Sequence, residues 1–466
     1  MKPSSSPSDP HDPYGAGGAG GAGASSLLGP LSGVQRVDAE LSDLALLRAM
    51  LDCERALAEA GADAGVVPPD AVTAIAAACK ADRFDLSQLG RDAQAAGNPV
   101  VPLVRAIDDQ LPAEAKPWLH HGGTSQDILD TALLLCVGRA LDAADLPEAP
   151  VAVAALARAH RHTLMPARTL GQQAGPTTFG LKAAGWLTGL VQAQERLDEA
   201  RSALPAQLGG ATGTLAAFGD AGPVVLERFA SRLGLATPVS PWHTNRQPIL
   251  RLAAALGAIA AACGKVAMDI TLFAQTEIAE VSEAAPGGSS ALPHKQNPVG
   301  SVLIIAIARR TPGLVATLYD ASLHEHERAF GSWHAEWEPL RELARLAGAA
   351  SVRTARVLSE LQVHPDKMRA NLDLTRGLVM SESIVARLAP ALGRTAAHKL
   401  LTKLGQAAAA SNTTLREQLV GDPDVRRVLT EDEIDAALDP AAWLGSADTL
   451  IDRALDAHAR CSKELP

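Results

Sequence analysis

Hydrophobic residues recur at helical spacing along most of the chain. In the first such segment, leucines follow this spacing from position 41 to position 57, and charged residues such as Asp52 and Glu54 lie between them. The pattern predicts an amphipathic helix with a buried leucine face and a polar face. Gly61 is the expected stop, because glycine readily adopts the left-handed backbone that ends many helices.

Longer hydrophobic segments follow between residues 126 and 363. Stretches rich in Ala, Leu and Ile, such as Leu250 to Val281, run for many helical turns with few helix breakers, which is typical of long helices in a bundle. After His364 the expected helices are shorter, and three prolines are expected to interrupt them: Pro390, Pro423 and Pro440. We find neither strand-like alternation nor a repeat of fixed period.

These patterns predict an all-α fold with three helical regions. A chain of 466 residues is longer than one compact domain usually is. Residues 1–26 are rich in Ser, Pro and Gly and lack a periodic apolar face, so a disordered tail is expected there. The N-terminal helical domain is expected at residues 27–125, the central helix bundle at 126–363 and the C-terminal helical domain at 364–466.

Composition narrows the classes of function. Apolar residues make up 47% of the chain and charged residues 20%, enough hydrophobic surface to fold. A formal net charge of −10 argues against a nucleic-acid partner. The five cysteines form no CxxC pair, which favours a reducing cytoplasm. No uninterrupted apolar run of about 18 residues and no secretory signal is present, so we expect a soluble protein without a membrane partner.

The segment from Gly287 to Pro298 is the strongest candidate for chemistry. Its glycines and prolines predict a non-helical loop between two helices. Ser289 and Ser290 supply hydroxyls, Lys295 a cation and Asn297 an amide, so the loop has the groups to close over an anion. From composition alone, a polar turn between helices explains the segment equally well.

Three further polar clusters have structural explanations beside functional ones. In residues 120–127, Thr124 or Ser125 can cap a helix that begins near Asp127, and the paired histidines lack the partners of a metal site. The amides and hydroxyls of residues 168–178 either satisfy one another or face a ligand. In residues 324–337, three histidines and several charges lie beside two tryptophans. A solvated helix face usually explains such a run, and the HExxH spacing of a zinc site is absent.

Together, these clusters resemble the fumarase/aspartase superfamily, whose signature loop reads GSSxMPxKxNP. Residues 288–298 match it, with Leu292 in place of the usual Met. Within the superfamily, the chain is most similar to the bacterial 3-carboxy-cis,cis-muconate cycloisomerases, and the resemblance extends from about residue 27 to the C-terminus. The other segments that carry it are Thr124–Asp127, Pro241–Arg246, His326–Arg328, Trp333–Trp337 and Asn371–Thr375.

The resemblance implies an intramolecular lyase of protocatechuate degradation that closes 3-carboxy-cis,cis-muconate to 4-carboxymuconolactone. It implies a homotetramer with sites built from several subunits, a small-molecule tricarboxylate substrate, and no metal or organic cofactor. Ser289 and Lys295 match the catalytic positions: Ser289 would move the carbon-bound proton, and Lys295 would stabilise the activated carboxylate. The matching substrate-binding positions are Asn98, His120, Thr124, Ser125, Gln126, Gln173, Arg246, Ser290, Asn297 and Arg328.

Two departures from the superfamily pattern bear on the reaction. Relatives that release an amine carry a histidine acid in the segment that here holds Leu170 and Gln173, neither of which can act as an acid near neutrality. This favours a carboxylate leaving group, which needs no proton. Gln247 replaces an Asp that often follows the arginine at position 246. The alternatives are an adenylosuccinate- or argininosuccinate-type lyase, or a catalytically silent helical oligomer.

Overall fold

The computed structural model describes residues 27–288 and 291–464. The expected tail at residues 1–26, together with Ser289 and Ser290, lies outside the described residues. The chain divides into two units: one comprises residues up to 146, 193–264 and 303–353, and the other comprises 147–192, 265–302 and the chain from 354 onward. The division into three helical regions stays a prediction.

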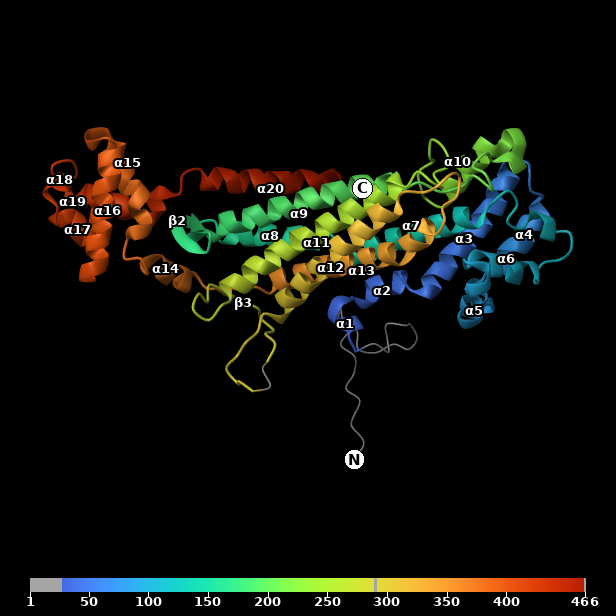
Figure 1. Cartoon of the computed structure of the whole chain (residues 1–466), viewed down its shortest axis with the longest axis horizontal. Coiled ribbons are helices and arrows are strands. Elements are labelled where there is room, and N and C mark those ends of the chain that lie inside the picture. The colour runs from blue at the N-terminus through green and yellow to red at the C-terminus, as the bar shows by residue number, and fades with distance from the viewer. Residues whose placement is uncertain (1–26, 289–290, 465–466) are drawn as a thin grey trace, which may run out of the picture. The chain divides into compact units, whose positions relative to one another are not determined.

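The first unit holds the N-terminal helices and a short segment near residue 220. Its elements are α1 (Gly29–Ser32), α2 (Gln35–Glu40), α3 (Asp43–Asp63), α4 (Pro69–Ala78), η1 (Ala81–Arg83), α5 (Leu86–Ala96), α6 (Val100–Asp108), η2 (Lys116–Trp118), α7 (Ser125–Ala144), η3 (Ala216–Ala221) and α10 (Gly222–Arg232). Four long helices contribute residues to both units: α9 (Phe179–Ser202), α11 (Gln247–Phe273), α12 (Val299–Ala321) and α13 (Ser332–Ser359). Figure 1 shows these elements.

The second unit holds shorter helices and two small antiparallel sheets. Its elements are α8 (Glu148–Ala159), β1 (Leu164–Thr169), β2 (Gln172–Thr178), β3 (Val281–Ser282), β4 (Gln362–Val363), α14 (Pro365–Asp373), η4 (Leu378–Met380), α15 (Ser381–Leu392), α16 (Arg394–Ser411), α17 (Leu415–Gly421), α18 (Pro423–Arg426), α19 (Glu431–Leu438), η5 (Pro440–Trp443) and α20 (Ala447–Glu464). The predicted all-α class is confirmed.

The core of the first unit forms around α7, which packs against α2 and α3. Every residue from Gln126 to Val137 is buried, because apolar side chains occupy most positions around this part of the helix. Each fully buried leucine contributes about 1.5–3 kcal/mol of hydrophobic stabilisation. Four buried α7 residues are polar, Gln126, Asp127, Asp130 and Thr131. Buried polar groups need hydrogen-bond partners, so neighbouring segments have to supply them.

The predicted first helix is confirmed as α3, with two differences. It runs past Gly61 to Asp63, and the left-handed turn follows at Gly65, whose φ is 73°. Glu54 lies on the buried face and is 1% exposed, so its assignment to the polar face was wrong. Glu54 comes three residues after Leu51 and three before Leu57, which places it on the same side of the helix as these buried leucines.

The strands β1 and β2 form a hairpin that the sequence pattern did not predict. They pair antiparallel from Leu164–Thr178 to Thr169–Gln172, with an irregularity in register near Pro166. Leu170 and Gly171 form the turn with φ of 51° and 78°, the two positive values that a type I′ turn requires. Hairpin turns are usually recognised by Asn-Gly or Asp-Gly, and the strands here lack hydrophobic alternation, so the usual signals are missing.

Helix ends in the second unit follow local chemistry. The predicted helix at Leu250–Val281 is α11, and it ends earlier, at Phe273. Pro390 lies inside the last turn of α15 and does not interrupt it, whereas Pro423 begins α18 and Pro440 begins η5. Proline is favoured at such first positions, where no backbone N–H is needed. The predicted short helices after His364 are confirmed.

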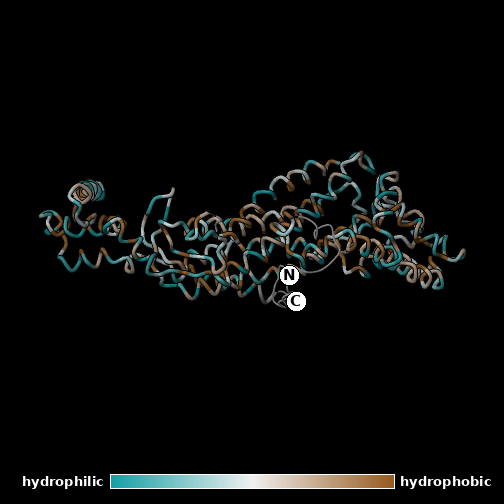
Figure 2. The backbone as a smooth tube through the Cα atoms, turned by 90° about the horizontal axis from the view of Figure 1, so that it is seen from below, coloured by the Kyte–Doolittle hydropathy of each residue, from teal (hydrophilic) through white to brown (hydrophobic). Residues whose placement is uncertain are grey.

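The helices α15, α16, α17 and α19 enclose a separate apolar cluster (Figure 1). Its fully buried members include Ile384, Leu388 and Leu415. Figure 2 shows hydrophobic and hydrophilic residues alternating along such helices, which is the pattern of amphipathic packing. Thr414 and Thr430 begin α17 and α19 with capping boxes, which satisfy backbone N–H groups that the helices leave free.

Two helices, α11 and α12, are long and apolar enough to cross a membrane by length and composition. In the most apolar 18-residue stretch of each helix, the buried share within the described chain is 56% for α11 and 22% for α12. Core helices of soluble proteins meet the same criteria, so these properties do not by themselves indicate a membrane span. Val302 and Tyr319 of α12 are each 49% exposed and leave apolar surface uncovered.

Candidate active site

The N-terminus of α7 is the centre of the polar cluster in the first unit. The helix predicted to begin near Asp127 begins at Ser125, with Thr124 as its N-cap. Thr124 and Asp127 form a capping box, in which the Thr124 backbone N donates to Asp127 Oδ2 at 2.9 Å. The hydroxyls of Thr124 and Ser125 therefore lie at a helix end whose dipole and free N–H groups favour anions.

Asp127 joins three segments that are distant in the sequence. Its Oδ1 contacts His243 Nε2 at 2.6 Å and accepts from the Gly209 backbone N at 3.0 Å. Its Oδ2 accepts from the Gly210 backbone N at 2.9 Å, in addition to Thr124. This fully buried carboxylate fixes the start of α7 against residues 209–210 and 243. Sequence reasoning identified Asp127 only as a helix start.

Arg246 lies in a buried ionic network with Asp130, which is one helical turn after Asp127 on α7. Its Nη1 contacts Asp130 Oδ2 at 2.8 Å and its Nη2 contacts Glu336 Oε2 at 2.6 Å, with side-chain exposures of 1–3%. Burial opposes the charge, but attraction to both carboxylates outweighs it and raises the pKa of the Arg246 guanidinium. Trp333 Nε1 also donates to Asp130 at 2.8 Å. The guanidinium is thus engaged within the protein, and its predicted substrate contact stays a prediction.

His324 belongs to the same network, so the solvated helix face expected for residues 324–337 is correct only in part. Residues 324–331 precede α13, which begins at Ser332, and the His324 side chain is 0% exposed. Its Nδ1 lies 3.1 Å from the His243 carbonyl oxygen and its Nε2 lies 3.2 Å from Glu336 Oε1. Glu336 and Trp333 are buried, and Arg246 of a distant segment pairs with Glu336, whereas Glu325 and Glu327 are exposed.

Arg328 and Gln126 connect this network to the α7 N-terminus. Arg328 Nη1 donates to Gln126 Oε1 at 3.1 Å, and its Nη2 donates to the carbonyls of Gly210 and Ala211 at 3.2 and 2.6 Å. Gln126 Nε2 donates to Asp130 Oδ2 at 3.1 Å. Among the described residues, no carboxylate lies within ion-pair distance of Arg328. The half-buried cation therefore remains available to an anionic ligand.

His120 precedes the α7 N-terminus and is held by Glu54. Its Nδ1 lies 2.7 Å from Glu54 Oε1, and its side chain is 20% exposed. Asn98, the remaining predicted site residue of this unit, accepts from the backbone N of Val100 and Val101 at 3.1 and 3.3 Å and caps α6. We call His120, Thr124, Ser125, Gln126, Asp127 and Arg328 the α7 cluster.

The Gly-Gly turn before Thr124 is required by close packing. Gly122 has φ of 72°, and a Cβ on it would overlap the ring of Phe218. We expect Gly122→Ala to lower the free energy of unfolding by at least about 1 kcal/mol, since left-handed backbone alone costs about 1–3 kcal/mol in other residues. Thermal and urea unfolding measure this change.

Gly138, inside α7, provides the matched control. A Cβ there meets no atom within 4 Å, and its backbone is helical. Gly138→Ala should therefore be neutral or stabilising by about 0.5–1 kcal/mol. Equal destabilisation by both substitutions would contradict the role of the Gly122 turn.

The second unit holds Gln173 in a separate polar cluster. Arg168 forms a two-pronged ion pair with the buried Glu280, with N–O distances of 2.9 and 2.7 Å. Asn371 Nδ2 donates to Glu280 Oε1 at 2.8 Å, and Gln173 Nε2 donates to the Asn371 carbonyl at 2.9 Å. Gln173 Oε1 is buried without a hydrogen-bond partner in the described chain. The side chains of Arg168 and Gln173 are therefore paired with partners outside residues 168–178, which neither of the two interpretations predicted.

The signature loop is closed at its base by backbone bonds. Gly287 and Asn297 exchange two N–H···O bonds of 2.9 Å each, and Asn297 Nδ2 lies 3.5 Å from the Gly288 carbonyl. Glu283, outside the loop, accepts from the backbone N of Gly300 and Ser301 at 3.0 and 2.8 Å. Lys295 is exposed. The predicted roles of Ser289 and Ser290 concern residues outside the described part of the chain.

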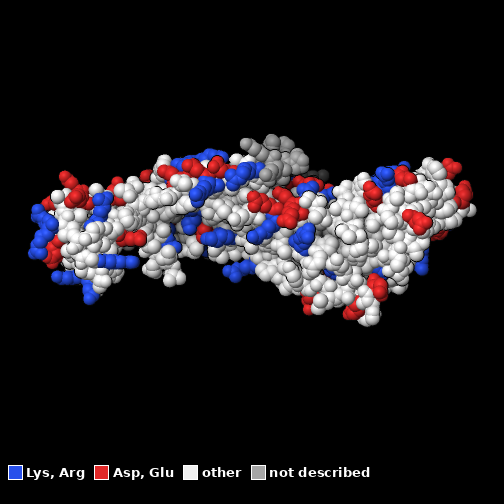
Figure 3. Space-filling view, turned by 90° about the horizontal axis from the view of Figure 1, so that it is seen from above, with Lys and Arg blue, Asp and Glu red and all other residues white. Residues whose placement is uncertain are grey.

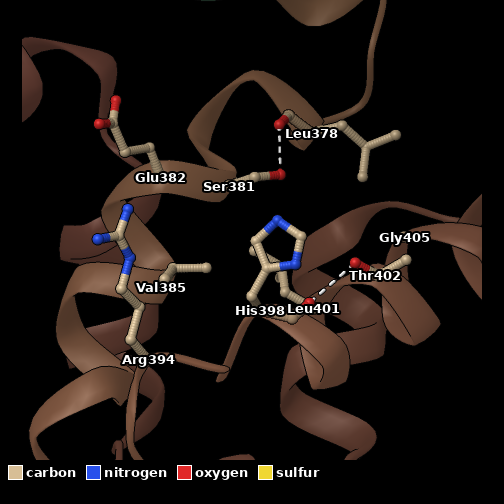
Figure 4. A pocket seen from close by; sticks show the side chains of 9 residues that line it. All are labelled: Leu378, Ser381, Glu382, Val385, Arg394, His398, Leu401, Thr402 and Gly405. Atoms are coloured by element: carbon tan, nitrogen blue, oxygen red, sulfur yellow. Dashed lines mark hydrogen bonds between the residues drawn. The ribbon is translucent and has the colours of Figure 1, made fainter. Parts of the chain in front are cut away.

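Other surface features offer no stronger site. Figure 4 shows a pocket between η4, α15 and α16, with a volume of about 460 Å³. Its lining includes the exposed residues Arg394, His398 and Thr402 and the buried Leu401. None of the predicted site residues lines it. On the face that Figure 3 shows, acidic and basic side chains are interspersed. Within residues 27–288 and 291–464, no group of three or more His, Cys, Asp or Glu side chains could hold a metal ion.

Glu54, Asp127, Asp130, Glu280 and Glu336 are among the buried charged groups to which the sequence pattern gave no functional role. Glu54 was detectable, because it occupies a leucine face at helical spacing. Asp127 and Asp130 lie in an otherwise apolar run that predicts a buried helix, and a charge there needs a partner. Their partners Arg246 and His243 are more than 110 residues away, so no local signal identified them.

Comparison with known proteins agrees with the motifs. The family model described as Lyase matches residues 32–313, and the model of the adenylosuccinate lyase C-terminus matches residues 377–454. Nitrosuccinate lyase of Streptomyces davaonensis is 46% identical over 92% of this chain and 94% of its own length. The 3-carboxy-cis,cis-muconate cycloisomerase of Bradyrhizobium diazoefficiens is 43% identical over 94% and 99%.

Solved structures give the same result. The crystal structure of the 3-carboxy-cis,cis-muconate lactonizing enzyme from Pseudomonas putida is similar with a TM-score of 0.88 at 41% sequence identity, covering 94% of this chain and 99% of that one. Similarity over nearly the full length of both chains, together with the family match over more than half of this chain, shows the family. The chain belongs to the fumarase/aspartase superfamily of lyases.

Proposed function

We propose that this protein is a 3-carboxy-cis,cis-muconate cycloisomerase, which forms 4-carboxymuconolactone in the cytoplasmic degradation of protocatechuate. The observation that carries the proposal against an amine-releasing lyase is Gln173, an amide at the position where amine-releasing relatives hold a histidine acid. Its Nε2 is engaged with the Asn371 carbonyl, and an amide cannot act as an acid near neutrality. In the reverse reaction a carboxylate leaves without receiving a proton, whereas an amine has to receive one.

The proposed reaction forms one C–O bond. A carboxylate oxygen of the substrate adds to the conjugated double bond, and the electron pair of that bond moves onto the carboxylate conjugated with it. A proton then passes to the adjacent carbon, and in the reverse direction it is removed from that carbon. We assign this transfer to Ser289. Because a serine hydroxyl is a poor base at its ordinary pKa, nearby cationic and N–H groups have to favour the alkoxide.

The developing charge requires preorganised donors. We assign Lys295 and Asn297 of the signature loop, together with Thr124 and Ser125, to the carboxylate that becomes enolate-like. The α7 helix end adds backbone N–H groups and a favourable dipole. The substrate carries three carboxylates, so His120 and Arg328 are suited to bind the non-reacting ones. Asn98, Gln126, Arg246 and Ser290 are retained as proposed binding residues.

We propose a homotetramer in which several copies of the chain build each site. The exposed apolar residues Val302 and Tyr319 on α12 support association, since such side chains gain hydrophobic stabilisation when a second copy covers them. The substrate is a free small molecule, and the proposed chemistry needs neither a metal nor an organic cofactor.

A second candidate is nitrosuccinate lyase, favoured by the relative of that name at 46% identity. Nitrite, like a carboxylate, leaves without being protonated, so Gln173 is compatible with this reaction too. In that case a proton is removed beside a carboxylate, and the C–N bond breaks as a C=C bond forms.

The purified protein distinguishes the two candidates. We expect ultraviolet absorbance of the conjugated diene to disappear when 3-carboxy-cis,cis-muconate is added. We also expect no nitrite to form from nitrosuccinate and no fumarate to form from adenylosuccinate. Release of nitrite with no loss of the diene would overturn the cycloisomerase assignment in favour of the second candidate. A protein inactive on all three substrates would revive the silent oligomer.

A further inference from the structure

Packing alone does not explain the contact between His120 and Glu54, because an apolar pair of similar size would fill the same space at least as well. Glu54 is an acidic residue on the leucine face of α3, and its side chain is 0% exposed. His120 Nδ1 lies 2.7 Å from Glu54 Oε1, and among the described residues His120 is the only cationic side chain in ion-pair distance of Glu54. The second oxygen, Oε2, is buried without a hydrogen-bond partner in the described chain. Burying a carboxylate this way is unfavourable unless its partner is charged.

The backbone also directs His120 into this contact. His120 adopts φ of 54°, a left-handed conformation that few residues other than glycine adopt. Its carbonyl accepts from the Gly123 backbone N at 3.1 Å, which closes the turn before α7. A Cβ on Gly123 would lie 3.1 Å from Leu57 and 3.4 Å from the His120 ring, so the imidazole is enclosed on that side.

We propose that Glu54 is a positioning residue that holds His120 as an Nε2–H donor toward a carboxylate of the substrate. Glu54 accepts the proton on Nδ1, which orients the ring and leaves Nε2 as the nitrogen available to a ligand. Nε2 makes no hydrogen bond to the described residues, and the side chain is 20% exposed. The inference rests on the proposed function for the identity of the carboxylate, but the pairing itself can be tested without substrate.

The electrostatics of the contact favour the imidazolium. Burial opposes the charge of His120, but the attraction and hydrogen bond of Glu54, on α3, and the weaker attraction of Asp127, on α7, outweigh it and raise the pKa of His120. An imidazole with a raised pKa is charged below that value and loses its charge as the pH rises through it. Binding that depends on the cation should therefore weaken on the alkaline side, above the ordinary histidine value of about 6.5.

The variant Glu54→Gln tests the charge while keeping a side chain of the same shape. An amide oxygen can still accept from Nδ1, so the ring orientation is preserved and the negative charge is lost. We expect the half-protonation pH of His120 to fall by about one pH unit or more. It is measured from the pH dependence of carbethoxylation by diethyl pyrocarbonate, which attacks the neutral imidazole, with modification at His120 located by mass spectrometry.

Glu59→Gln is the matched control, because Glu59 lies on the same helix and pairs with Arg232 at 2.8 Å instead of His120. Glu59→Gln should leave the titration of His120 unchanged. Neither substitution should change the rate at which the exposed His398 is carbethoxylated. An unchanged half-protonation pH in Glu54→Gln would overturn the inference. If that variant does not fold, the wild-type protein provides the test. Half-protonation of its His120 at or below pH 6.5 would also overturn the inference.

Kinetics with 3-carboxy-cis,cis-muconate then connect the pair to the proposed function. We expect Glu54→Gln to raise KM about tenfold at pH 7.5 with a smaller change in kcat, and to move the alkaline fall of kcat/KM to lower pH. A variant with a lowered His120 half-protonation pH but wild-type KM and pH profile would overturn the substrate-binding role. If the wild type has no activity on carboxymuconate while His120 titrates as expected, the proposed function fails and the Glu54–His120 pairing stands.

Discussion

Replacing Ser289 by alanine is expected to lower kcat for carboxymuconate by about 10²- to 10⁴-fold, the usual contribution of a group that transfers a proton. The hydroxyl is proposed to move the carbon-bound proton, and alanine has no group to do so. KM should change little, because the residues proposed to bind the carboxylates, Lys295, Asn297 and Arg328 among them, are unchanged. Stopped-flow or steady-state absorbance of the diene measures both constants.

Ser359→Ala is the control for this experiment. Ser359 is exposed at the end of α13, and its hydroxyl donates to the Arg356 carbonyl. The substitution should leave kcat and KM unchanged. A Ser289→Ala enzyme whose kcat stays within a few-fold of the wild type would remove the proton-transfer role of Ser289 and leave only the carboxylate-binding part of the mechanism.

Replacing Arg246 by methionine is expected to destabilise the protein by about 3–5 kcal/mol. Methionine fills much of the same volume, but it leaves the buried Asp130 and Glu336 without the guanidinium that both of them contact. The carboxylates then repel each other in a region with little water. The midpoint of urea denaturation, followed by circular dichroism, measures the loss.

Arg139→Met provides the comparison, since Arg139 pairs with Asp52 at 2.8 Å where both side chains are at least 30% exposed. Exposed ion pairs contribute about 0–1 kcal/mol, so this variant should unfold close to the wild-type midpoint. Equal midpoints for the two variants would show that Arg246 does not stabilise the fold. A stable but inactive Arg246→Met enzyme would instead support its predicted contact with substrate.

The difference between Lys295 and Arg246 shows why a sequence match alone does not settle a residue's role. Both are cations at positions that match the family's motifs. Lys295 is exposed in the signature loop, whereas Arg246 is 1% exposed and paired with two carboxylates. This pairing joins one residue of α7, one residue of α13 and Arg246, which lies just before α11. No local sequence pattern predicts contacts between segments so far apart.

The hairpin and Glu54 show two other limits of local patterns. The β1–β2 turn uses Leu170 where Asn or Asp would have signalled a hairpin, and the strands are held by pairing with each other and by contact with α14. Glu54 was placed on the polar face because charge usually marks exposure. His120, 66 residues away, supplies the partner that this burial requires.

The sequence by itself determined the helical class, the start of α7, the signature loop and the superfamily, because these depend on local periodicity, capping chemistry and a contiguous motif. The tertiary structure alone decided which charges are buried, which partners neutralise them, and that Asp127 holds two distant segments, residues 209–210 and 243, at the α7 N-terminus. The physical reason is that a buried charge is tolerated only with an opposite charge or several hydrogen-bond donors around it, and here those partners come from segments that only folding brings together.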